Sequence, residues 1–163
     1  MVSKRQSFDE GHKRKFMAVI DNSPECGRAV LYAGRRAAKT GGGLVLLYVC
    51  PPADFQHWLG VEEIMRAEAR EEADAALHKF AQYSREKANV DPELVIREGQ
   101  TAEEIQKQIE EDRDIANLVL AAGEDKEGPG PLVSSIARRG SGFDIPVTIV
   151  PSGMADEDIE ALA

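Results

Sequence analysis

Two short apolar runs in this chain end at residues that suit the binding of a small ligand. Phe16–Ile20 is followed by Asp21, and Leu118–Ala122 is followed by Gly123 and a loop rich in glycine and proline. A buried parallel strand presents its carboxyl end to the ligand crevice of an α/β sheet in this way. A carboxylate there can accept hydrogen bonds from an amino group or a sugar hydroxyl, and glycines let backbone N–H groups approach phosphates closely. The pattern indicates a nucleotide-type site.

Alternating strand and helix patterns would position these residues. Ser23 offers a hydroxyl N-cap, and Pro24 follows at the first helical position, where its missing N–H costs nothing. The predicted strands are 16–20, 44–50, 93–97, 118–122 and 147–150, and the predicted helices are 24–40, 61–88, 101–114 and 132–139. This alternation requires helices on both faces of a parallel sheet, joined by right-handed crossovers. We therefore predict an α/β fold with a doubly wound five-stranded parallel sheet.

The length of 163 residues and a hydrophobic fraction of 42% allow one good core, so we expect one domain. Residues 1–14 are polar, carry mixed charge and show no periodicity, which predicts a flexible N-terminal arm. Residues 152–163 predict an acidic C-terminal tail with at most a frayed helical turn. The folded domain is expected over 15–151.

The formal net charge of -9 argues against nucleic acid and anionic membrane surfaces as partners, because binding to a polyanion requires a basic patch. No apolar run approaches the ~20 residues that a membrane span needs, and the N-terminus lacks the apolar centre of a secretory signal. Cys26 and Cys50 have no metal-ligand spacing and are expected to be reduced, packed thiols. We predict a cytoplasmic protein.

Three stretches together are specific enough to suggest a family. They are Phe16-Met-Ala-Val-Ile-Asp-Asn-Ser-Pro24 before an alanine-rich helix, Leu46-Leu-Tyr-Val49, and Ile145-Pro-Val-Thr-Ile-Val-Pro151. In this order and spacing the chain resembles the universal stress protein (UspA-like) family over residues 15–151. The resemblance implies an adenine-nucleotide α-hydrolase-like fold with strand order 3-2-1-4-5. It also implies a homodimer that pairs through the last strand, at Val147, Thr148, Ile149 and Val150.

The same resemblance implies that Asp21 and Val49 hold adenosine in nucleotide-binding members. A carboxylate at a strand end can accept from the adenine amino group or a ribose hydroxyl, and an aliphatic side chain can pack on the base. The structural alternatives are an Asx turn or a helix cap for Asp21, and plain core packing for Val49.

The family's phosphate signature is glycine, two residues, glycine, nine residues, glycine, then serine or threonine. Gly123 matches the first glycine, but Lys126 stands at the second position, and the closing pair lacks its glycine. Glu124, Asp125 and Glu127 place acid where a triphosphate would lie, and this opposes binding.

Gly128 and Gly130 could still form a phosphate loop that leads to the hydroxyls of Ser134 and Ser135 and to a helix N-terminus. The alternative is a rigid surface turn, which we favour. ATP or another adenine nucleotide remains the cofactor that the resemblance suggests.

No arrangement of side chains in the sequence predicts catalysis or a metal site, since His12, His57 and His78 are scattered. The leading hypothesis is a non-catalytic, dimeric stress-response module that senses a nucleotide. One alternative is an ATP-binding protein with weak hydrolysis. Another is a pure interaction module, in which the long acidic helix docks an unknown protein client.

Overall fold

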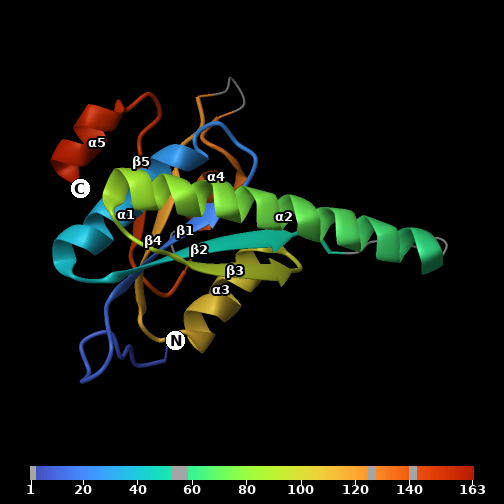
Figure 1. Ribbon diagram of the computed structural model, residues 1–163, viewed down its shortest axis with the longest axis horizontal. Coiled ribbons are helices and arrows are strands. Elements are labelled where there is room, and N and C mark those ends of the chain that lie inside the picture. The colour runs from blue at the N-terminus through green and yellow to red at the C-terminus, as the bar shows by residue number, and fades with distance from the viewer. Residues whose placement is uncertain (1–2, 53–58, 125–127, 140–142) are drawn as a thin grey trace.

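The computed structural model describes residues 3–52, 59–124, 128–139 and 143–163. The strands are β1 Lys15–Ile20, β2 Gly43–Cys50, β3 Glu93–Glu98, β4 Ile115–Ala121 and β5 Val147–Val150. The helices are α1 Cys26–Thr40, α2 Leu59–Ala88, α3 Thr101–Glu111, α4 Pro131–Arg139 and α5 Asp156–Leu162. All strand pairs are parallel, and the sheet order is β3-β2-β1-β4-β5 (Figure 1). The predicted doubly wound fold and strand order are confirmed.

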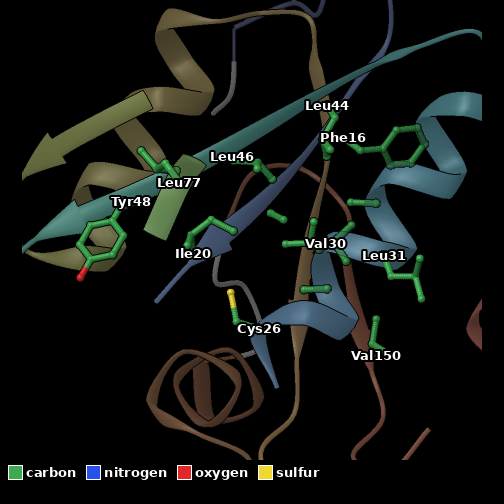
Figure 2. Packing of buried hydrophobic residues seen from close by; sticks show 14 of the residues in the cluster. Phe16, Ile20, Cys26, Val30, Leu31, Leu44, Leu46, Tyr48, Leu77 and Val150 are labelled. Atoms are coloured by element: carbon green, nitrogen blue, oxygen red, sulfur yellow. The ribbon is translucent and has the colours of Figure 1, made fainter. Parts of the chain in front are cut away.

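Each face of the sheet has its own core, because successive strand residues point to opposite faces. On one face, β1 and β2 pack against α1 and α2, with Phe16, Ile20, Leu46 and Leu77 among the buried residues (Figure 2). On the other face, a second apolar cluster packs against α3 and α4. Its buried members include Met17, Val19, Val45, Leu47, Ile105, Ile109 and Val133. The central strands are therefore apolar on both sides, as their uninterrupted hydrophobic runs predict.

The N-terminal segment is docked on the domain, where the sequence predicted a free arm. The Arg5 side chain donates from Nη2 to the carbonyl oxygens of Ile109, Asp112 and Ile115, at 2.7, 2.7 and 2.9 Å. The Gln6 amide also donates to a backbone carbonyl, that of Arg113, at 2.9 Å. The last carbonyls of a helix have no intrahelical partner, and a guanidinium with several donors satisfies them. Arg5 therefore has a structural role that the mixed charge and missing periodicity of this segment did not indicate.

The C-terminal segment also differs from its prediction. Residues 156–162 form α5, which packs on α1 through Ile159, a side chain with no exposed surface. Lys39 at the end of α1 donates from Nζ to the backbone carbonyls of Glu160 and Ala163. One buried apolar side chain and the hydrogen bonds from Lys39 thus hold this acidic helix on the body of the domain.

The long helix α2 begins at Leu59, two residues before its predicted start, and its first turns extend beyond the sheet (Figure 1). Val61, Ile64 and Met65 lie there with 47, 60 and 42% of their surfaces exposed. No helix in the described part of the chain is both long and apolar enough to cross a membrane.

The turn from α1 into β2 depends on a close backbone approach at Gly42. A Cβ at this position would overlap the carbonyl oxygen of Arg14, and that oxygen accepts a hydrogen bond from the Gly43 amide at 2.9 Å. The contact joins the start of β1 to the start of β2, so a side chain there must push two central strands apart.

We therefore expect Gly42→Ala to lower the free energy of unfolding by about 2 kcal/mol. The matched control is Gly60→Ala in α2, where an added Cβ meets no atom within 4 Å. The control should be neutral or stabilise by up to about 1 kcal/mol, because alanine is the better helix former. Urea unfolding of both variants measures this, and equal effects would contradict the proposed role of Gly42.

Candidate functional site

A cleft lies between the carboxyl ends of β1 and β4, where the sheet order reverses direction. The cleft is open to solvent, and its empty space, open solvent included, is about 450 Å³. The chain leaves β1 for α1 on one face and leaves β4 for α4 on the other, so the loops diverge and leave a crevice. Its walls are Val19, Asp21, Ser23, Glu25, Cys26, Ala29, Leu120, Ala121, Pro129, Gly130, Pro131, Leu132 and Val133.

The turn after β1 is built on the Asp21 carboxylate. Its Oδ1 accepts from the Ser23 amide at 2.9 Å and from the Ser23 hydroxyl. This Asx turn uses the hydroxyl that was expected to cap the helix, and α1 starts at Cys26 instead of at Pro24. Asp21 is exposed and lines the cleft, and the turn fixes its carboxylate in place.

The same turn is tied to α2. Asn22 donates from Nδ2 to the Glu72 carboxylate at 3.0 Å, and the Tyr48 hydroxyl lies 3.5 Å from the same nitrogen. Burial, followed by the charge of Glu72, raises the pKa of Tyr48. The phenol therefore stays protonated at neutral pH. Asn22 thus connects the turn to both α2 and β2.

The loop after β4 closes on itself. The Gly123 amide donates to the carbonyl of Pro129 at 3.1 Å, and the Ala122 amide donates to Val150 at 2.9 Å. Gly128 and Gly130 have φ angles of +105° and +104°, a region in which an L side chain is strained. Gly123, the first glycine of the family's phosphate signature, thus donates its N–H group to the Pro129 carbonyl and not to a ligand.

A carboxylate lies against that glycine. Glu25 Oε1 lies 3.0 Å from the point where a Cβ on Gly123 would stand, so the Glu25 carboxylate occupies the space on the open side of the Gly123 Cα. Glu25 is partly buried, and it is the residue that precedes α1, a position that favours negative charge. Asp21 and Glu25 both line the cleft, and no described lining residue is cationic.

The opposite wall offers backbone donors. Pro131 begins α4, and the Ser134 amide makes the first helical bond, to the Gly130 carbonyl, at 2.9 Å. Helix geometry leaves the amides of Leu132 and Val133 without intrahelical acceptors, and both residues line the cleft. The amides at this N-terminus can donate hydrogen bonds to a ligand atom that carries a partial negative charge.

Cys26 is the one sulfur on the cleft wall. Its Sγ lies 3.8 Å from the Val19 carbonyl oxygen, only 3% of the residue is exposed, and burial raises the pKa of its thiol to about 12. The thiol is protonated at neutral pH and supplies no nucleophile. Cys26 and Cys50 are both free and buried, as predicted.

The structure brings some of the predicted site residues together and separates others. Asp21 and Gly130 line the cleft. Val49 is half-buried against the apolar cluster of α3 and α4, and Gly123 and Gly128 belong to the closed loop next to the cleft. Ser134 and Ser135 lie further along α4 and do not form its wall. Lys126 lies outside the described residues.

The sequence analysis missed Glu25. It stands directly before the helix, where an acidic residue is usually explained by the helix dipole alone. Its position beside Gly123 brings together residues 98 positions apart, which no local pattern could indicate. No group of three or more metal-binding side chains occurs among the described residues.

A parallel sheet with a cleft at its switch point defines this chain as a doubly wound α/β protein. The sequence profile of the universal stress protein family matches residues 13–151, and the chain belongs to this family. The resemblance seen in the sequence is confirmed. A comparison with curated proteins gives no sequence match.

Solved structures share the fold. Universal stress protein UspA from Lactobacillus plantarum superposes with a TM-score of 0.70 at 17% identity, over 84% of this chain and 97% of that one. A universal stress protein from Archaeoglobus fulgidus, in complex with dAMP, gives 0.55 at 17% identity, over 84% and 97%. A family protein from Arabidopsis thaliana with AMP bound gives 0.57 at 17% identity, over 88% and 94%.

Proposed function

We propose that this protein is a non-catalytic stress-response module that binds an adenine nucleoside or nucleotide in the cleft between β1 and β4. The observation that carries the proposal is the fixed Asp21 carboxylate on the cleft wall. Family membership and the structures of relatives with dAMP and with AMP support the choice of an adenine ligand.

The cleft has the chemistry that adenosine needs. Asp21 offers an acceptor for the adenine amino group or a ribose hydroxyl, while Val19, Leu120 and Val133 supply an apolar surface for the base. Backbone donors at the start of α4 complete the polar contacts. Two free, buried cysteines suit a reducing compartment, and we propose a cytoplasmic location.

The same residues favour binding without chemistry. The one thiol on the wall is protonated, and the described lining residues include no histidine, lysine or arginine to serve as a base or to stabilise a transition state. The alternative of ATP binding with weak hydrolysis is less well supported, because carboxylates line the cleft and the Gly123 amide is occupied.

A role in protein interaction is compatible with this proposal. The exposed apolar residues Val61, Ile64 and Met65 lie on the part of α2 that extends beyond the sheet. Exposed apolar side chains grouped on one helix are a common feature of protein-binding surfaces, so a protein client could bind there.

Asp21→Asn tests the adenosine site. Asparagine keeps an oxygen that can accept from the Ser23 amide, but it removes the negative charge and one carboxylate acceptor. We expect adenosine affinity to fall about tenfold, the size of one lost charged hydrogen bond. Isothermal titration calorimetry measures the change, with thermal unfolding as the control for an intact turn. Unchanged affinity would remove Asp21 from the site.

We also propose that the protein forms a homodimer through β5. This strand is at the sheet edge and pairs with β4 on one side, and no described strand pairs with its other side. Ile149 is 38% exposed on it. Pairing of two copies would satisfy the backbone groups and cover this side chain.

Light scattering at micromolar concentration should give the mass of two chains for the wild type and of one chain for Ile149→Asp. The matched control is Ile64→Asp on α2, which adds the same charge at a residue that is 60% exposed and should leave the mass unchanged. A monomeric wild type, or a dimer insensitive to Ile149→Asp, would contradict the β5 interface.

A further inference from the structure

We infer that Glu25 determines the ligand class of the cleft, so that it selects an uncharged adenine nucleoside over nucleotides that carry phosphate. This inference rests on the proposed function and names the ligand of the same cleft. It starts from the Glu25 carboxylate, which occupies the space where a Cβ on Gly123 would stand and lines the cleft together with Asp21.

Gly123 is the position at which the family's phosphate signature begins. In this chain its amide donates to the Pro129 carbonyl, and its Cα side faces the Glu25 carboxylate. A phosphate at this point would meet a negative charge in place of an N–H group. At Gly123 the N–H group is therefore already engaged, and a carboxylate lies on the open side of the residue.

No cationic side chain is among the described residues that line the cleft. Arg28, one turn along α1, donates from Nη2 to the Ala122 carbonyl at 3.2 Å and does not line the cleft. Asp21 adds a second negative charge on the same wall. Two carboxylates in a partly enclosed cleft repel a phosphate more strongly than they would in water.

An uncharged nucleoside avoids this repulsion. Its base can use the apolar wall of Val19, Leu120 and Val133, and its hydroxyls can donate to the carboxylates. The carboxylates then act as acceptors for sugar hydroxyls. The inferred order of affinity is adenosine, then AMP, then ATP.

Glu25→Gln tests the inference, because glutamine keeps the size and an acceptor oxygen while it removes the charge. The control is Glu63→Gln, at an exposed position near the start of α2, which makes the same change in net charge far from the cleft residues. Adenosine, AMP and ATP are titrated into each protein by calorimetry without divalent metal.

We expect wild type and Glu63→Gln to bind adenosine at least tenfold more tightly than AMP. Glu25→Gln should tighten AMP about tenfold and ATP by more, while adenosine changes less than twofold. The difference between wild type and Glu25→Gln should shrink as salt is added. A loss of helix stabilisation alone would change the unfolding temperature and leave the ratio of affinities unchanged.

The outcomes separate the two proposals. If adenosine binds and AMP binds equally well to wild type and to Glu25→Gln, the inference about Glu25 is wrong and the adenine site stands. If none of the three ligands binds to either protein, the proposed function fails and the inference fails with it.

Discussion

The parallel pairing of β1 with both β2 and β4 is the constraint on which the rest of the structure depends. Every residue from Phe16 to Ile20 is buried, so β1 has no edge and no solvent face. The sheet continues from β1 through β2 to β3 on one side and through β4 to β5 on the other. The connections after β1 and β4 must therefore run to opposite faces, and the cleft between them follows from topology before any side chain is considered.

Backbone hydrogen bonding then decides what the cleft can hold. Buried amides and carbonyls need partners, and after β4 the Gly123 amide finds one within the loop, at Pro129, while the Ala122 amide finds one at Val150 of β5. The turn after β1 is satisfied in the same way by the Asp21 side chain. Among the described lining residues, the first amides of α4 lack intrahelical acceptors, and the carboxylates of Asp21 and Glu25 supply acceptor oxygens. The polarity of the site results from this distribution.

The sequence predicted the parts of the fold that depend on local pattern. Mostly apolar segments of four to seven residues predicted the strands, and the order of strands and helices predicted the doubly wound sheet. The docking of Arg5 on the end of α3 and of Ile159 on α1 could not be predicted, because each depends on a single residue that meets a distant segment. The position of Glu25 beside Gly123 could not be predicted for the same reason. Asp21 was found because a strand end followed by a carboxylate is a local signal, and its Asx turn was one of the two interpretations considered.

The central claim is that the cleft between β1 and β4 is where an adenine nucleoside binds. Amide chemical shifts during an adenosine titration, followed by ¹⁵N NMR, test this claim most directly. The account predicts saturable shifts at Asp21, Ser23, Gly130 and Val133, with little change at the exposed start of α2 or along β5. Shifts centred on other residues, or no saturable shifts at millimolar adenosine, would contradict it.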